Sequence, residues 1–184
     1  MNIAPLGREA TLEDLWEFED PAELIDGRIV PMSPKDFRPG QAAYRIHRSL
    51  EAYQDEHGGG RPISQGIGFV FDTPRAQYFI PDAFWWIGPV PERGSLKGAP
   101  AFAAEVRSES DYGPTAERAM AIKRGHYFAG GTQVVWDVDV LREGWVRVYR
   151  ADDPENPTIY RRGEIAEAEP AVPGWRMPVD ELFD

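Results

Sequence analysis

Cysteine is absent from the 184 residues of this sequence. This absence excludes a disulfide scaffold, a thiolate zinc site and a cysteine nucleophile, and it is compatible with a reducing compartment. Long apolar runs are absent too, since no stretch approaches the roughly 18 apolar residues that a membrane-spanning helix needs. The first residues, "MNIAPLGREATLEDLW", lack the positive-then-apolar arrangement of a signal peptide. We therefore expect a cytoplasmic protein with no membrane partner.

Positive charge is scarce, and this limits the choice of partners. The sequence has 20 Lys and Arg residues against 31 Asp and Glu residues, which gives a formal net charge of −11. Such a surface repels nucleic acid unless a local basic face exists. Residues 28–48 carry five basic residues against one acidic residue: Arg28, Lys35, Arg38, Arg45 and Arg48 against Asp36. Arg38, Arg45 and Arg48 are candidate nucleic-acid contacts, although a solvated face with scattered charges explains the stretch about equally well.

The residues that are present suit a globular chain, with 42% hydrophobic and 28% charged residues. Helical patterns occur over residues 11–20, 40–60 and 115–131, with Thr11 and Thr115 as candidate N-caps. Short segments rich in β-branched and aromatic residues predict strands within 66–72, 78–88, 101–108, 132–140 and 144–150.

Two features predict how these elements connect. Asp26 and Gly27 separate two short apolar segments, which is a hairpin signal. The helix over 115–131 lies between two apolar strands, and this βαβ arrangement predicts a parallel strand pair. We therefore expect a single mixed α/β domain over residues 1–184. Its core is expected at about 11–150, followed by a C-terminal extension over 151–184 with loops and one short strand near Ile159.

Three acidic residues stand out because of the apolar segments around them. Asp82 follows Pro81 between "YFI" and "AFWWIG", Glu105 follows "FAA", and Glu23 precedes "LIDG". A carboxylate in such surroundings is costly unless it is paired, hydrogen-bonded or bound to a metal. Two carboxylates at neighbouring strand ends can hold a hard divalent cation through oxygen ligands. Two simpler interpretations stay open: Asp82 caps a turn, and Glu105 pairs with a base at a sheet edge.

A lysine falls on the apolar stripe of the helix that follows Glu105. The stripe runs through Ala116, Ala119, Met120 and Tyr127, and Lys123 lies three residues after Met120. Lys123 is therefore predicted to face the sheet, where lysine is rare unless it is paired. The alternative is a snorkelling lysine that covers apolar surface.

The ordered set Asp82, Glu105 and Lys123 resembles the PD-(D/E)xK nuclease superfamily, with Pro81-Asp82 as its "PD". More closely, the chain resembles a bacterial family labelled as restriction endonucleases, the Uma-type family. Four stretches carry this resemblance in the family's order: "AELIDGRIVPMSP", "IPDAFWWIG", "AFAAEVRSESD" and "KRGHYFAGGTQVVWDVD". Together they cover most of residues 11–150.

The resemblance implies a restriction-endonuclease-like fold, in which helices flank a mixed central β-sheet. It also implies that Asp82 and Glu105 bind Mg²⁺ or Mn²⁺ and that Lys123 orients a water or stabilises charge. Glu23 matches the family's early acid, either as an accessory ligand or as a group that supports the ligands from behind. We add the carbonyl of Val106 as a candidate ligand. The family often has a histidine just before its second helix, where this sequence has Pro39.

Arg107 lies two residues after Glu105, so it is predicted to face the same side of the sheet. Arginine suits a phosphate contact but stays protonated, so it is not a candidate base.

The resemblance therefore implies a Mg²⁺-dependent endonuclease that hydrolyses phosphodiester bonds of DNA. The alternative is a weak or inactive module with the same fold that binds protein or nucleic acid. No P-loop, Rossmann glycine pattern, HExxH or GxSxG motif occurs, so nucleotide-fold and serine-hydrolase functions find no support. The six tryptophans, among them Trp85 and Trp86, are expected in the core or at a subunit interface. An exposed aromatic edge would favour a homodimer.

Overall fold

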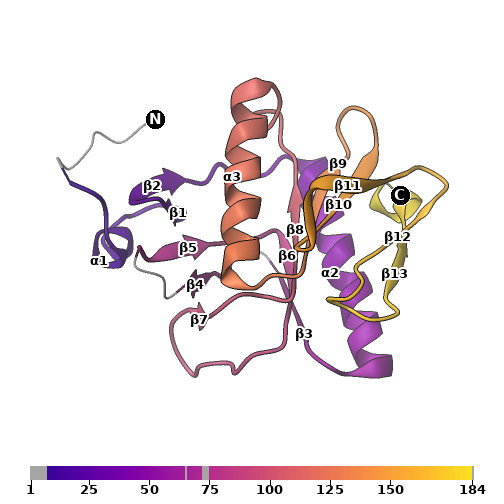
Figure 1. Ribbon diagram of the computed structural model, residues 1–184, viewed down its shortest axis with the longest axis horizontal. Helices are drawn as coiled ribbons and strands as arrows, with labels where there is room; N and C mark the ends of the chain where they lie inside the picture. The colour runs from indigo at the N-terminus through magenta and orange to yellow at the C-terminus, as the bar shows by residue number, and fades with distance from the viewer. Residues whose placement is uncertain (1–7, 65, 72–74, 184) are drawn as a thin grey trace.

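Two β-sheets and two long helices make up most of the fold. The computed structural model describes residues 8–64, 66–71 and 75–183. Figure 1 shows helix α3 (Pro114–Gly130) upright between the two sheets, and helix α2 (Phe37–His57) on the side away from the smaller sheet. The predicted mixed α/β class is confirmed.

The larger sheet has six strands in the order β11-β10-β9-β8-β6-β3. Their bounds are β3 Arg61–Ser64, β6 Ala83–Trp86, β8 Phe102–Val106, β9 Val134–Asp139, β10 Trp145–Arg150 and β11 Asp153–Arg161. Strands β8 and β9 are parallel and are joined through α3, as the βαβ pattern predicts. The other neighbouring strands of this sheet pair antiparallel.

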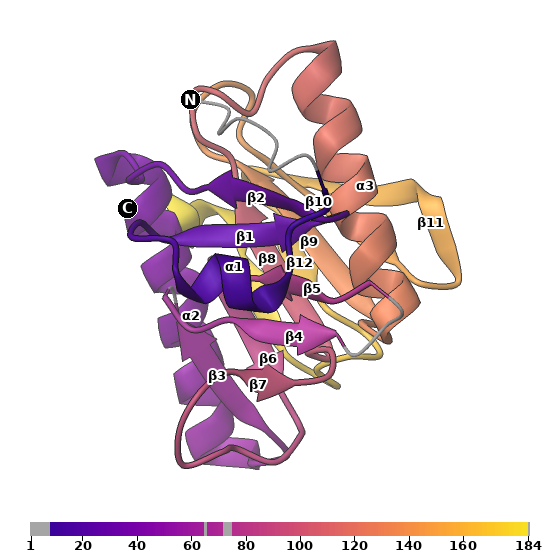
Figure 2. The same cartoon turned by 90° about the vertical axis from the view of Figure 1, so that its left-hand side faces the viewer.

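The smaller sheet has five strands in the order β2-β1-β5-β4-β7, and Figure 2 shows it face-on with α3 beside it. Its strands are β1 Ala22–Ile25, β2 Arg28–Pro31, β4 Phe69–Phe71, β5 Gln77–Phe79 and β7 Leu96–Lys97. The predicted hairpin joins β1 to β2, and Asp26 and Gly27 have the positive φ angles, 49° and 70°, that such a tight turn requires. Helix α1 (Leu12–Trp16) precedes β1 and is capped by Thr11, as predicted.

Helix α3 begins earlier than the sequence suggested. Its N-cap is Gly113 and its first residue is Pro114, so the prediction of Thr115 as N-cap is wrong. Proline is well suited to the first helical position because it has no N–H to leave unsatisfied. Helix α2 also begins earlier, at Phe37, and contains Pro39 in its first turn.

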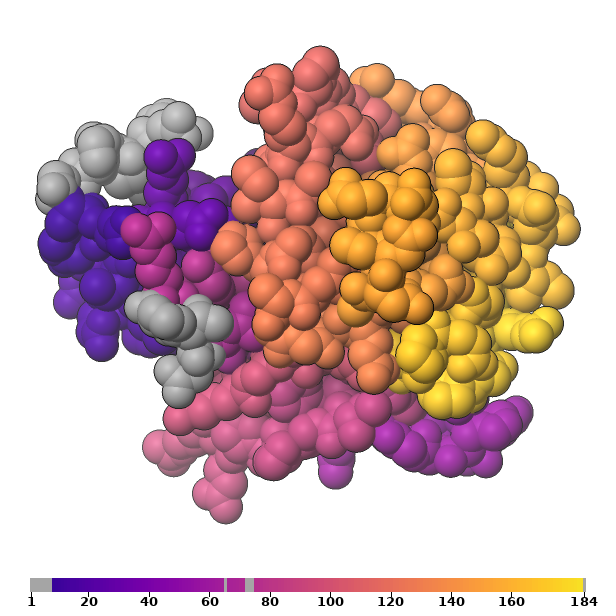
Figure 3. Space-filling model, in the orientation of Figure 1, coloured from indigo at the N-terminus to yellow at the C-terminus, as the bar shows by residue number. Residues whose placement is uncertain are grey.

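The C-terminal residues are more regular than expected. Besides β11 they form β12 (Ile165–Glu167), β13 (Arg176–Pro178) and the 3₁₀ helix η1 (Val179–Leu182). In the space-filling view these yellow residues lie against α2, and α3 forms a ridge between the N-terminal elements and the late strands (Figure 3). Trp175 and Met177 are buried in the main core, so this segment completes the core.

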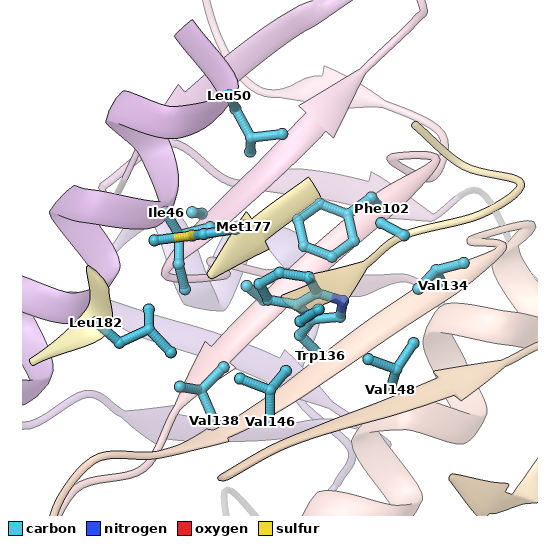
Figure 4. Packing of buried hydrophobic residues seen from close by; sticks show 14 of the residues in the cluster. Ile46, Leu50, Phe102, Val134, Trp136, Val138, Val146, Val148, Met177 and Leu182 are labelled. Atoms are coloured by element: carbon cyan, nitrogen blue, oxygen red, sulfur yellow. The ribbon is translucent and has the colours of Figure 1, made fainter. Parts of the chain in front are cut away.

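Alternation of side chains gives the six-stranded sheet two different faces. One face carries Phe102, Ala104 and Trp136 and packs on Ile46 and Leu50 of α2 (Figure 4). The opposite face carries Phe84, Trp86, Ala103 and Val135, and it packs on Tyr127 of α3 and on the phenylalanines of the five-stranded sheet. Glu105 follows Ala104 in β8 and therefore belongs to this second face.

Among the helices of the described residues, none combines the length and the apolar character that a membrane span requires.

Candidate active site

Asp82 and Glu105 lie at ends of neighbouring strands that meet. Strands β6 and β8 are antiparallel with Ala83 opposite Ala104, so the residue before β6 lies next to the end of β8. Asp82 is 3% exposed, and its Oδ2 accepts a hydrogen bond of 2.7 Å from the backbone N–H of Val106. The fold therefore fixes the Asp82 carboxylate beside the Glu105–Val106 strand end.

Lys123 reaches the sheet from α3 and is paired there with two carboxylates. Its Nζ lies 2.9 Å from Oε1 of Glu23 and 3.0 Å from Oε1 of Glu105. The side chains of Lys123, Glu23 and Glu105 are 17%, 7% and 15% exposed. The prediction that Lys123 faces the sheet is confirmed, and the ammonium has charged partners that a lysine covering apolar surface would lack.

Glu23 holds Lys123 from the five-stranded sheet. The carboxylate of Glu23 lies on β1, and its Oε1 also accepts a hydrogen bond of 2.8 Å from the backbone N–H of Ile80. Burial alone would lower the pKa of Lys123, but the charges of Glu105 and Glu23 raise it well above its usual value. The side chain is therefore a permanent ammonium at neutral pH.

Glu105 is oriented by Tyr127 as well as by Lys123. The hydroxyl of Tyr127, which is fully buried, donates a hydrogen bond of 2.6 Å to Glu105 Oε1. Burial raises the pKa of Glu105 to about 7; Lys123 opposes this shift, and the charges of Asp82 and Glu23 add to it. In the described part of the chain both side-chain contacts of Glu105 fall on Oε1, and Glu105 lines the neighbouring cavity.

Lys35 brings a second ammonium to the same place. Its Nζ lies 2.9 Å from Asp82 Oδ2 and donates a hydrogen bond to the carbonyl oxygen of Val106. These are two of the three oxygen donors predicted to bind a metal. They therefore converge on one cationic position, which the Lys35 ammonium takes in this structure.

The arrangement fits a hard divalent cation. The donors at this position are oxygens only, from Asp82 and Val106, and Glu105 supplies a second carboxylate from the same strand end. Mg²⁺ usually binds through one or two protein carboxylates together with waters and substrate phosphate. Within residues 8–64, 66–71 and 75–183, no three His, Cys, Asp or Glu side chains form a ready-made metal cluster.

A cavity of about 210 Å³ adjoins these groups. Glu23 and Glu105, the two carboxylates paired with Lys123, line this cavity. The other polar lining residues include Lys123 itself, Lys35, Tyr127 and Arg124. The guanidinium carbon of Arg124 lies 3.8 Å from the centre of the Tyr149 ring, and its Nη1 is buried without a hydrogen bond to any described residue. The cavity is thus lined by both acidic and basic groups.

Arg107 lies beside the cavity but is occupied inside the protein. Its Nε and Nη2 each donate a 2.7 Å hydrogen bond to Asp137, and its remaining donors bind Glu117 and the carbonyl of Asp111. All five guanidinium donors are therefore engaged, and the side chain is 1% exposed. The phosphate contact expected of Arg107 stays a prediction, and in this structure the residue links β9 to α3.

The three candidate nucleic-acid arginines lie on α2. Arg38 and Arg48 are exposed, and Arg48 donates a hydrogen bond to the Tyr44 hydroxyl. Arg45 donates to the backbone of Glu181. Their contact with nucleic acid stays a prediction.

Sequence reasoning named Asp82, Glu105, Lys123 and Glu23, and the structure brings these four together. It missed Lys35 as a member of the site, because Lys35 lies in an irregular segment with no periodicity to orient its side chain. Sequence reasoning placed Tyr127 only on the apolar stripe of the helix. A hydroxyl on that stripe was the available signal, since a buried tyrosine O–H usually finds a partner.

The comparisons with known proteins agree on the kind of fold. The sequence model of the Uma2 family, described as "Putative restriction endonuclease", matches residues 12–180. No match was found among curated proteins. Among solved structures, the chain is similar to a crystal structure described as "a putative nuclease belonging to DUF820 from Anabaena variabilis", with 18% sequence identity. The TM-score is 0.73 over 94% of this chain and 97% of that chain, which confirms the predicted nuclease-like fold.

Proposed function

Because this chain belongs to the Uma2 family of restriction-endonuclease-like proteins, we propose that it is a Mg²⁺-dependent endonuclease that hydrolyses phosphodiester bonds of DNA. One observation supports this most directly. The Asp82 carboxylate and the Val106 carbonyl oxygen both contact the ammonium of Lys35, so they converge on one cationic position. Glu105 brings a second carboxylate to the same strand ends. A buried ammonium, Lys123, stands beside them.

The proposed metal ligands are Asp82, Glu105 and the carbonyl of Val106, with Mg²⁺ as the expected ion and Mn²⁺ as a substitute. Such an ion supplies a water of lowered pKa and neutralises charge on a phosphoryl group. Oxygen ligands of this kind suit both ions.

The protein's own groups have distinct roles in this proposal. Lys123 cannot accept a proton, because Glu105 and Glu23 hold its pKa high; it orients the attacking water or stabilises negative charge on the phosphoryl group. Glu23 positions Lys123 rather than touching substrate. Tyr127 fixes the orientation of Glu105 through its 2.6 Å hydrogen bond.

The test is cleavage of supercoiled plasmid and short duplex DNA in the presence of Mg²⁺ or Mn²⁺. We expect Asp82→Asn and Lys123→Met each to reduce the cleavage rate about 100-fold or more, the scale of losing one preorganised electrostatic group. Lys97→Met is the matched control, because it removes the same charge from an exposed position on β7. Cleavage that persists at the wild-type rate in both site variants would overturn the assignment, and parallel assays with RNA would identify the preferred nucleic acid.

A second function is favoured by the position of Lys35. An ammonium already occupies the cationic position between Asp82 and Val106, and Pro39 stands where the family often has histidine. A domain of this kind could bind nucleic acid or protein without cutting. Gel-shift binding of duplex DNA with no cleavage in either Mg²⁺ or Mn²⁺ would support this function over the first.

A homodimer and a cytoplasmic location complete the proposal. Five of the six tryptophans are buried, so the tryptophans do not form the exposed edge on which a dimer was expected. What supports a dimer is a pair of exposed apolar residues after β6, Ile87 and Val90. Light scattering coupled to gel filtration measures the mass directly, and a monomer at micromolar concentration would refute the dimer.

A further inference from the structure

Lysine is rare in this chain and concentrated in the candidate site. The sequence has three lysines and 17 arginines. Two of the three lysines, Lys35 and Lys123, line the cavity, and the third, Lys97, is exposed on β7. An ammonium is a compact point charge on a flexible stem, so it can occupy a cation position and leave it again, which a planar guanidinium does less readily.

Lys35 and a metal ion would contact the same oxygen atoms. The Lys35 ammonium touches Asp82 Oδ2 at 2.9 Å and the Val106 carbonyl oxygen. A magnesium ion binds such oxygens at about 2.0–2.1 Å. Two cations that share these oxygens repel each other, and the repulsion is stronger inside the protein than in water.

We propose that Lys35 is a built-in competitor of the metal: its ammonium holds the metal position in the metal-free protein and withdraws when a divalent cation binds. This inference rests on the proposed function, since it concerns the same ligands. It assigns Lys35 the role of setting the metal concentration at which the site is filled.

The segment that carries Lys35 allows this withdrawal. Residues 32–36 form no helix or strand, and Ser33, Pro34 and Asp36 are exposed. The Lys35 side chain is itself 21% exposed, so its path to solvent is short. Rotation about the bonds of its four-carbon stem is enough to release the oxygens, and neither β2 nor α2 has to change.

The charge balance favours exchange over joint occupancy. With all carboxyls ionised, Glu23, Asp82 and Glu105 face two ammonium groups, and one negative charge is left over. Replacing the Lys35 ammonium by a divalent cation neutralises that charge. Keeping both cations would leave a positive excess in a largely buried site, which is unfavourable.

Calorimetric titration with Mn²⁺ alone tests the competition. Lys35→Met is expected to bind Mn²⁺ at least about tenfold more tightly than wild type, because no binding free energy is spent on displacing the ammonium. Tenfold corresponds to about 1.4 kcal/mol, near the lower limit for a hydrogen bond to a charged group. Lys97→Met removes the same formal charge from an exposed position and is expected to bind within about twofold of wild type.

The outcomes separate this inference from the proposed function. Equal affinities for wild type and Lys35→Met overturn the competitor role and leave the metal site standing. Absence of Mn²⁺ binding by both proteins removes the metal site and the competitor together. Circular dichroism of each variant verifies that it is folded before titration.

A second measurement uses the unaltered protein. Acetylation with a limiting amount of an amine-reactive ester, followed by peptide mass spectrometry, reports the accessibility of each lysine. Saturating Mn²⁺ is expected to raise the labelling rate of Lys35 several-fold and to leave that of Lys97 unchanged. A Lys35 rate that does not change on Mn²⁺ binding overturns the inference even if the titrations differ.

Discussion

Replacing Lys123 by methionine is expected to destabilise the metal-free protein strongly. The ammonium lies 2.9 Å from Glu23 and 3.0 Å from Glu105, and all three side chains are less than one-fifth exposed. Methionine matches the length of the stem but removes the charge, so two carboxylates are left in a largely buried site without this counterion. Breaking a buried ion pair by removing one partner costs about 3–5 kcal/mol.

Urea unfolding in EDTA, followed by tryptophan fluorescence, measures this cost. The double variant Lys123→Met/Glu23→Gln is the informative companion, because the glutamine oxygen can still accept the hydrogen bond from Ile80 while one of the two unpaired charges is gone and only that of Glu105 is left. We expect it to recover part of the lost stability yet still fail to cleave DNA. That result separates the structural contribution of the ammonium from its catalytic one.

Two results would contradict this reasoning. If Lys123→Met lies within about 1 kcal/mol of wild type, the ammonium makes no buried ion pair in solution, and the lysine merely covers apolar surface. If the double variant cleaves DNA at the wild-type rate, Lys123 is structural and the proposed catalytic set is wrong.

Two further predictions concern the surroundings of the site. Arg107→Met should cost about 3–5 kcal/mol in urea unfolding, because Asp137 is 1% exposed and loses its bidentate partner, whereas exposed Arg118→Met should change stability by less than about 0.5 kcal/mol. Burial opposes ionisation of Asp139, but hydrogen bonds from Tyr112 and three backbone amides hold its pKa below the usual 3.8. The stability from this carboxylate is therefore present above about pH 4 and is lost as the pH falls through the lower folded pKa. Asp139→Asn should flatten this acid-induced loss, and parallel pH–stability curves for the two proteins would contradict the reasoning.

Signals that lie within one segment predicted local structure well. The Asp26-Gly27 turn, the long helices and the apolar strands each carry their pattern in a few neighbouring residues, and the structure has them. The parallel pairing of β8 with β9 was also predictable, because a helix between two apolar strands allows few alternatives.

Partners that come from distant segments were not predictable in the same way. The short strands β4, β5 and β7 join a second sheet, and nothing in two or three residues indicates which sheet a strand will enter. Lys35 meets Asp82 across 47 positions of sequence from a segment without regular structure. Its side-chain direction depends on the tertiary path of the chain rather than on any local repeat.

The pairing of Lys123 with two acids has a consequence for when the site exists. Glu23 belongs to the five-stranded sheet, Glu105 to the six-stranded sheet, and Lys123 to the helix between them. During synthesis, Glu23 and Glu105 both emerge before Lys123, so the triad is completed only after α3 has formed and both sheets have docked on it. Local opening of the β1–β2 hairpin would dismantle the triad while the larger sheet stays intact, since separate units of a fold can open independently. A chain that is unfinished or partly open therefore lacks the assembled site.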